Sequence, residues 1–520
     1  MIQNDKEMFM MKQYETFELS WQGPVLTEDY AAIDLEAVFT QGETGVKVKG
    51  FYDGDGVYKV RFLPMEAGAW QWTVRGLITD AGEAECAPAE SHGPVYAKGT
   101  AFQYADGTPF HPFGTTVYAL AHQDDALIEQ TMQTLAGAPF NKIRMCVFPK
   151  HYDFNHNDPT YYAFEKDAHG EWDPTRPCIP FWHALEKHIA RLDGMGIQVD
   201  LILFHPYDRW GFNGMGAEKD KTYLDYLLRR LSACPNVWWS LANEYELCKR
   251  TEEEWFAVEG FIAENDPYHH LLSCHNIFKL WDATRPLTTH ASIQGKNLFR
   301  LPEWIKQYQK PVMIDECCYE GNLEHFWGSI TGKEMVRRFW QTVSTGAYCT
   351  HGETFYSDDE VLWWARGGKL KGESAPRIAF CRQVIEGLPG HLEPDNGWLS
   401  QLATLAQLSP EEQEKMIARA PEMAQFMIRA FLNGGQNAID QSRIEFGWFG
   451  HIGEDVFLHY HDTRPTARDT LKLPEGKTYR VEVLDTWNMT RETVAQGVSG
   501  EYVVQLPGRE YMAVLATVEK

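Results

Sequence analysis

The hydrophobic positions of this chain follow three patterns in succession, and the first is strict alternation. From residue 12 to about residue 97, apolar and polar residues alternate with period two, as in Phe17-Glu-Leu-Ser-Trp21 and Trp70-Gln-Trp-Thr-Val74. Turn residues such as Asp53-Gly54-Asp55-Gly56 separate these runs. Short alternating runs divided by tight turns are typical of antiparallel strands, so residues 1–97 are expected to form an immunoglobulin-like β-sandwich.

After Gly99 the pattern changes to short apolar runs that alternate with amphipathic helical stretches. This alternation predicts a parallel sheet with crossover helices, and eight such units over about 280 residues fit a (β/α)8 TIM barrel spanning residues 98–390. The clearest helices are expected at 181–192, 222–231, 252–263 and 333–343. The eight strands are expected at 113–119, 142–148, 198–204, 237–242, 271–275, 290–293, 311–315 and 347–351.

Beyond residue 390 the barrel pattern ends and a helical segment follows. Ser409-Pro410-Glu411-Glu412 combines a serine cap, a proline in the first turn and a glutamate that completes a capping box. The helix continues, with a break at Pro421, to about Leu432, and residues 391–450 are interpreted as an insertion or linker rather than a lid. Alternation returns from Val456, which predicts a C-terminal β-sandwich over residues 451–520.

The composition of the chain limits the kinds of molecule that are expected to bind it. A net charge of -25 repels phosphate backbones, so no nucleic acid is expected to bind, whereas a neutral sugar is unaffected. No uncharged apolar run reaches 18 residues, so no membrane association is expected. The first residues of the chain include acidic side chains, whereas a signal peptide begins with a basic region. The ten cysteines are scattered along the chain, as is typical of free thiols in a reducing compartment. Both observations favour a cytoplasmic protein. The cysteines and histidines lack zinc-site spacing, so neither a metal nor a cofactor is expected.

Two apolar runs end in a glutamate. Glu244 follows the fourth predicted strand and Glu316 follows the seventh. Because the carboxyl ends of barrel strands form one face, both carboxylates should converge on one pocket, which is the layout for cleaving a glycosidic bond. Each glutamate alone is more often structural, for example beside a helix N-terminus. The two positions together predict a catalytic pair.

These residues resemble the clan A glycoside hydrolases. In that clan an acid/base glutamate follows an asparagine at strand four and a nucleophilic glutamate ends strand seven, as in Trp239-Ser-Leu-Ala-Asn243-Glu244 and Val312-Met-Ile-Asp-Glu316. A β-sandwich before a barrel whose first strand reads Phe110-His-Pro-Phe-Gly-Thr-Thr-Val-Tyr118 is similar to the apiosidase-like branch, with an added C-terminal β-domain. The resemblance covers nearly the whole chain.

The resemblance implies a role for each matching residue. Glu244 would be the general acid/base and Glu316 the nucleophile, while Asn243 would bind the sugar 2-hydroxyl and Arg144 would lie beside the nucleophile. Tyr118, at the end of the first strand, is assigned to the substrate site. For Arg144 a surface ion pair is the alternative.

Further substrate contacts are expected where strands end. His205 after strand three and His275 after strand five match sugar-lining positions, with a structural histidine as the alternative for each. The tyrosine that is usual in the clan after strand six is replaced by the segment 290–294, and the tryptophan that is usual after strand eight is replaced by the segment 351–354. The second segment contains Glu353, a third carboxylate that could bind sugar hydroxyls or form a buried ion pair. The predicted loops hold aromatic residues that could stack on sugar rings: Trp210, Phe212, Trp327, Tyr356, Trp363 and Trp364.

The sequence therefore predicts a retaining glycoside hydrolase, exo-acting on small plant or microbial oligosaccharides by double displacement. Two alternatives stay open. A metal-dependent barrel hydrolase is disfavoured because His111-Pro-Phe lacks a His-x-His pair, and a carbohydrate-binding barrel without activity is disfavoured because both glutamates are present. The sequence does not determine the sugar, the linkage or the anomeric configuration, and a homo-oligomer stays open.

Overall fold

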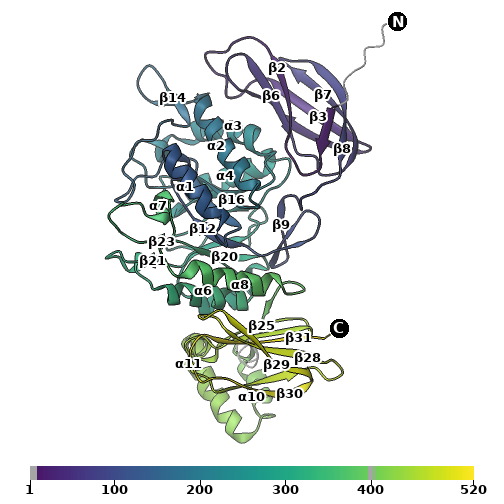
Figure 1. Cartoon of the computed structure of the whole chain (residues 1–520), viewed down its shortest axis with the longest axis vertical. Coiled ribbons are helices and arrows are strands. Elements are labelled where there is room, and N and C mark those ends of the chain that lie inside the picture. Colours follow the sequence, from purple (N-terminus) through teal and green to yellow (C-terminus); the bar gives the residue numbers. More distant parts are fainter. Residues whose placement is uncertain (1–8, 396–401, 403, 520) are drawn as a thin grey trace.

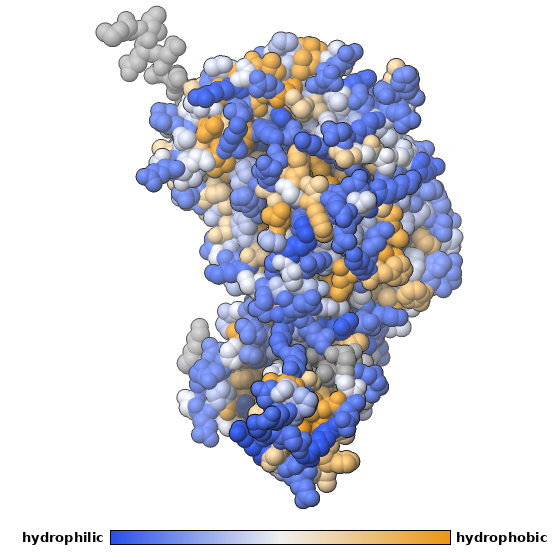
Figure 2. All heavy atoms as spheres, turned by 180° about the vertical axis from the view of Figure 1, so that it is seen from behind, coloured by the Kyte–Doolittle hydropathy of each residue, from blue (hydrophilic) through white to orange (hydrophobic). Residues whose placement is uncertain are grey.

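The computed structural model describes residues 9–395, 402 and 404–519, in three parts that follow one another along the longest axis of the molecule. Figure 1 shows an N-terminal β part at one end, a barrel with its helices in the middle, and a C-terminal β part beside helix α11 at the other end. Polar side chains cover most of the opposite face, between separate hydrophobic areas (Figure 2). Among the described residues, no helix combines the length and apolar character that crossing a bilayer requires. All ten cysteines are free thiols, as predicted.

The N-terminal part is the predicted β-sandwich. The core lies between its two sheets, where the rings of Phe39 and Phe62 stack with centroids 4.1 Å apart. Inward and outward residues alternate along the strands because a pleated strand directs successive side chains to opposite faces. One sheet has the order β1 (Phe9–Lys12), β8 (Asp80–Ala87), β7 (Gly68–Gly76), β3 (Leu35–Gln41) and β4 (Thr44–Lys49); the other has β2 (Phe17–Gln22), β6 (Val57–Phe62) and β5 (Phe51–Tyr52).

The barrel contains the eight predicted parallel strands. Their hydrogen-bonded order runs from the fifth strand back to the first and then from the eighth to the sixth, and a parallel bridge between His275 and Ser292 joins the fifth strand to the sixth. In chain order they are β12 (Phe113–Thr116), β13 (Lys142–Cys146), β16 (Gln198–Phe204), β17 (Val237–Ala242), β18 (Leu272–Ser273), β19 (Ala291–Gln294), β20 (Val312–Glu316) and β22 (Tyr348–His351).

Helices and short strands fill the connections between the barrel strands. The loop after β13 carries the hairpin β14 (Phe164–Lys166) and β15 (Trp172–Pro177), and β21 (Glu320–Gly321) pairs with β23 (Glu353–Thr354). The helices are α1 (Asp125–Ala136), α2 (Ile179–Asp193), α3 (Ala217–Leu231), α4 (Glu252–Asn265), α5 (Leu301–Tyr308), α6 (Gly332–Ser344), α7 (Trp363–Arg366) and α8 (Ser374–Glu386).

A small sheet that the sequence pattern did not reveal closes one end of the barrel. It consists of β9 (Val95–Lys98), β10 (Ala101–Tyr104) and β11 (Pro109–Phe110). Phe102 of this sheet stacks on Trp238 near the start of β17, with ring centroids 5.1 Å apart. Burial of these rings seals the amino ends of the barrel strands, so a ligand site is left to the carboxyl ends.

The C-terminal part begins with helices and continues as β structure. Ser409 caps α10 (Pro410–Ile417) with the predicted capping box, and α11 (Glu422–Phe446) has non-helical backbone at Gly435 and extends past the predicted end near Leu432. The sheet also includes residues before the predicted boundary at 451, namely β24 at Glu393–Pro394 and the start of β25 at Trp448. Its order is β24 (Glu393–Pro394), β25 (Trp448–Ile452), β26 (Val456–Tyr460), β31 (Met512–Val518), β28 (Tyr479–Asp485) and β29 (Thr490–Val498), beside a pair of β27 (Arg468–Leu473) and β30 (Gly500–Gln505).

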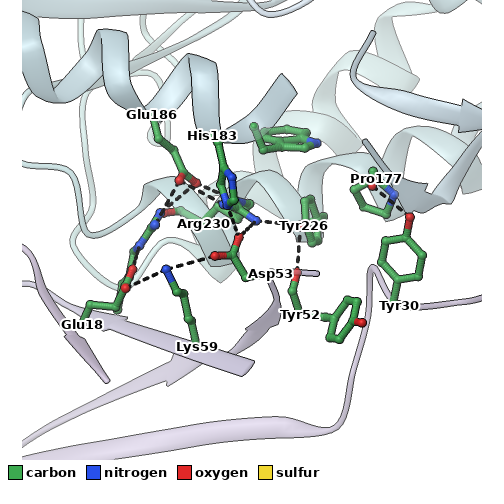
Figure 3. A network of polar contacts seen from close by, with 12 residues as sticks. Glu18, Tyr30, Tyr52, Asp53, Lys59, Pro177, His183, Glu186, Tyr226 and Arg230 are labelled. Atoms are coloured by element: carbon green, nitrogen blue, oxygen red, sulfur yellow. Dashed lines mark hydrogen bonds and ion pairs between the residues drawn. The ribbon is translucent and has the colours of Figure 1, made fainter. Parts of the chain in front are cut away.

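A charged network joins the N-terminal sandwich to the barrel (Figure 3). Arg230 of α3 is fully buried and lies 2.8 Å from Asp53 of the sandwich and 2.5 Å from Glu186 of α2. Lys59 and His183 contact the same Asp53 carboxylate, at 3.0 and 2.8 Å. A buried cation held by two carboxylates from different parts fixes the sandwich against the barrel.

We expect Arg230→Ala to lower the free energy of unfolding by about 3 kcal/mol, the lower end for a broken buried pair, because it removes the buried cation between Asp53 and Glu186 while Lys59 and Arg61 still pair with these carboxylates. Urea titration followed by tryptophan fluorescence measures the change. Lys47→Ala is the control, since Lys47 pairs with Glu36 at the surface and such exposed pairs contribute about 0–1 kcal/mol. Equal shifts of the two variants would contradict a stabilising role for the network.

Candidate active site

A cavity of 670 Å³ lies at the carboxyl ends of the barrel strands. Each of the eight strands, or the loop after it, contributes to the lining, for example Tyr118 after β12, Tyr207 after β16 and Trp364 after β22. Glu244 and Glu316 both line it, so the structure brings the two predicted carboxylates into one pocket. Its volume is in the range of sites that enclose small ligands.

Glu244 is held in a strained and largely buried position. Its backbone has φ 51°, a left-handed conformation that costs free energy for a residue with a long side chain such as glutamate. The hydroxyl of Tyr207 donates to Oε2, and Gln294, with its amide nitrogen turned toward the pocket, donates to Oε1 at 3.1 Å. Burial and the nearby Glu316 carboxylate raise the pKa of Glu244 to about 7. Glu244 therefore holds a proton up to neutral pH.

Glu316 is surrounded by groups that favour its negative charge. The hydroxyl of Tyr118 donates to Oε1, and Nη1 of Arg144 lies 3.7 Å from the same oxygen. Arg144 is fully buried, and its Nε lies 3.3 Å from Asp200. Lys142 bridges Asp200 and Asp315 at 2.8 and 2.7 Å. The charges inside the barrel thus hold the guanidinium in place under the Glu316 carboxylate.

Asn243 lies beside this pair, and the NH2 group of its side chain is available to a ligand. Its Oδ1 is 3.0 Å from the Tyr118 hydroxyl. Its Nδ2 is buried and has no hydrogen-bond partner among the residues that the structure describes. Because a buried amide without a partner costs free energy, this donor is suited to a ligand oxygen. The geometry agrees with the expected contact to a sugar hydroxyl.

Several residues that the sequence assigned to the substrate lie outside the cavity lining, among them Arg144, His205, His275, Trp210 and Glu353. His205 is buried, with Nε2 3.1 Å from the carbonyl oxygen of Phe148, and His275 is fully buried in the barrel wall. Trp210 donates from Nε1 to Asp158 at 2.9 Å. The Glu353 carboxylate accepts the backbone N–H groups of Lys371 and Gly372, at 2.7 and 3.1 Å. Arg144 apart, these side chains have packing or loop-fixing contacts instead of pocket contacts.

Glu353, Glu320 and His351 form a cluster of possible metal ligands, the one such cluster among the described residues. Ligand atoms of the three lie within 4.8 Å of one another. Both Glu320 oxygens already accept backbone N–H groups, from Glu373 and Ser374, and the cluster does not line the cavity. Its evident role is to fix segment 371–374.

Several residues of the pocket were missed in the sequence. Tyr207 lies two residues beyond His205, and Gln294 ends β19. Lys150, Tyr319 and two exposed rings, Phe278 and Phe326, also line the cavity. Of the predicted aromatic residues, Trp327 and Trp364 line it, while Trp210, Phe212, Tyr356 and Trp363 do not. Side chains two residues apart in an extended segment point the same way, so the choice of His205 could have drawn attention to Tyr207 as well.

All three parts of the chain match known protein families, and nearly the whole chain is similar to a solved structure. Residues 97–401 match the family described as apiosidase-like, catalytic domain, and residues 10–76 and 447–517 match two domains of unknown function, DUF5060 and DUF5605. A crystal structure described as a "putative glycoside hydrolase" from Bacteroides vulgatus ATCC 8482 is 32% identical, with TM-score 0.83, covering 98% of this chain and 100% of its own.

A second structure shares the fold at lower identity. The glycoside hydrolase family 5 protein from the same organism is 15% identical, with TM-score 0.58, covering 82% of this chain and 93% of its own. The comparison with curated proteins found no match.

Proposed function

The chain belongs to the apiosidase-like family of glycoside hydrolases, and on that basis we propose that it cleaves glycosides with retention of the anomeric configuration. The observation that carries the proposal is the pair of glutamates in one pocket, each with different partners. Glu244 has a raised pKa, whereas Glu316 lies 3.7 Å from the guanidinium of Arg144. Such an unequal pair suits one carboxylic acid and one carboxylate.

The reaction would proceed by double displacement. Glu316 attacks the anomeric carbon while Glu244 donates its proton to the glycosidic oxygen, so the bond to the leaving group breaks and a glycosyl ester forms. Glu244, now ionised, removes a proton from water, which attacks the same carbon and releases Glu316. Two inversions restore the original configuration. Retaining enzymes separate these carboxyl groups by about 5–5.5 Å.

We propose that the substrate is a small oligosaccharide cut from its end. The sheet β9–β11 closes the amino ends of the strands, so the sugar enters and leaves through the same opening. Phe278 and Phe326 line the cavity and are 85% and 73% exposed, so they are available to stack on the next sugar or on another leaving group. Exo action is proposed because a pocket with a sealed base and aromatic residues at its rim suits a chain end with a short leaving group.

The test is a screen of nitrophenyl glycosides, pentosides included, followed by NMR of the first product formed. We expect the anomer released first to have the configuration of the substrate. An inverted first product would rule out double displacement, and loss of activity with a chelator would favour a metal-dependent hydrolase. Failure to cleave any glycoside, with sugar binding intact, would favour a binding protein.

A further inference from the structure

Lys150 is a buried cation without an anionic partner inside the proposed substrate pocket. It lies in the loop after β13, is 2% exposed and lines the cavity. Among the residues that the structure describes, no carboxylate oxygen comes within 4.0 Å of its Nζ, and no acceptor forms a hydrogen bond with it. Its partners are aromatic rings, with centroids 3.4 Å away for Tyr118, 4.4 Å for Tyr207, 5.1 Å for Tyr152 and 5.9 Å for Trp364.

These rings place the ammonium group between the two carboxylates. Tyr118 donates to Glu316 and Tyr207 donates to Glu244, and the two tyrosines also have the shortest ring distances to Nζ. A sugar whose anomeric carbon lies between Glu244 and Glu316 would therefore lie against Lys150. The leaving group would then extend toward Phe278 and Phe326, the exposed rings of the same lining.

Without a ligand, the charge of Lys150 is offset among the described residues only by the four rings and by the Glu244 and Glu316 carboxylates, which lie beyond ion-pair distance. Cation–π contacts contribute about 0.5–2 kcal/mol each, but a ring face does not replace the oxygen acceptors that an ammonium group has in water, so its three N–H donors remain available to a ligand. Burial accordingly lowers the pKa of Lys150. An anion in the pocket would supply the missing charge, and hydrogen bonds between charged groups are about twice as strong as neutral ones. A neutral hydroxyl would compensate less and could be bound by an amide.

We infer that Lys150 binds a carboxylate on the sugar held between the two glutamates, so that the substrate class is glycosides of uronic acids. This inference rests on the proposed glycosidase function and adds the class of sugar that the enzyme would accept. Arg144 cannot serve the substrate in this way, because it does not line the cavity and its guanidinium lies against Asp200 and Glu316. Lys150 is thus the buried cation in the lining that is free to select an acidic ring.

The experiment compares matched substrates on the purified full chain: nitrophenyl glucuronides and galacturonides against the corresponding glucosides and galactosides, in both anomeric forms. We expect a higher kcat/KM for a uronide. Lys150→Met should lower that value about 100-fold, the cost of removing one partner of a buried charge pair, and should change hydrolysis of neutral glycosides far less. Lys150→Arg should retain part of the preference. Lys279→Met, at an exposed lysine outside the lining, is the matched control.

The outcomes separate the two claims. If neutral glycosides are cleaved in preference to uronides, or if Lys150→Met affects both substrates equally, the inference is overturned and the glycosidase function stands. If no glycoside of either kind is cleaved, the proposed function fails, and isothermal titration with free glucuronate and galacturonate decides the inference. Binding that Lys150→Met abolishes would support it, and absence of binding to the folded wild-type protein would overturn it.

Discussion

Glu316→Ala is expected to lower kcat by on the order of 10⁵-fold, or about 6.8 kcal/mol of transition-state stabilisation, while the fold remains intact. Alanine removes the oxygen that would attack the anomeric carbon, and water cannot replace it at the same distance. The small side chain leaves Tyr118 and Arg144 in place because both have other contacts, to Asn243 and Asp200. Steady-state kinetics with a nitrophenyl glycoside and circular dichroism give the two measurements.

Azide separates a missing nucleophile from a damaged pocket. A small anion can enter the space left by the Glu316 carboxylate, so we expect added azide to restore turnover and to give a glycosyl azide of inverted configuration. Glu324→Gln is the control, since Glu324 follows the same strand but its side chain is 79% exposed. It should stay within twofold of the wild type, as a surface substitution does. Near-normal hydrolysis by Glu316→Ala would remove the nucleophile assignment.

The barrel could be predicted from the sequence because its strands are buried on both faces. Such strands are continuous apolar runs, and the residue that ends each run lies at the carboxyl face whatever the exact register. Glu244 and Glu316 were found in this way, whereas Asn243 was assigned through the resemblance to the clan A glycoside hydrolases. The fifth strand shows the limit of the method. It was expected at 271–275, but regular pairing covers only Leu272–Ser273.

The rest of the site depends on side-chain direction beyond the strand ends, which apolar runs do not encode. His205 has the chemistry expected of a sugar ligand but lies below the pocket wall, whereas Tyr207 contacts Glu244. Glu353 was expected either to bind sugar hydroxyls or to form a buried ion pair, and it lies buried, with Oε2 accepting the backbone N–H groups of Lys371 and Gly372. Lys150 went unnoticed because an isolated lysine in a loop is usually exposed. Contacts between loops decided each of these cases.

Glu244→Gln is expected to lower kcat/KM about 1000-fold for glycosides with poor leaving groups, and much less for those with activated nitrophenols. A good leaving group departs without the proton that Glu244 supplies, so the loss should grow with leaving-group pKa. The wild-type rate should fall as pH rises through about 7, where Glu244 loses its proton, and the variant should lack this alkaline limb. Equal losses for all leaving groups would contradict the acid role.

The same variant should be more stable than the wild type at alkaline pH, and the difference should depend on pH. The pKa of Glu244 rises from an ordinary 4.5 to about 7 on folding, so between these values the folded state holds a proton that the unfolded state has lost. Wild-type stability therefore falls as pH rises through this window, by on the order of 1–3 kcal/mol, and glutamine does not titrate. Urea unfolding at pH 5 and pH 8 measures the difference. A stability difference that is the same at both values would show that Glu244 is ionised throughout, and a carboxylate that is already ionised cannot protonate the leaving group.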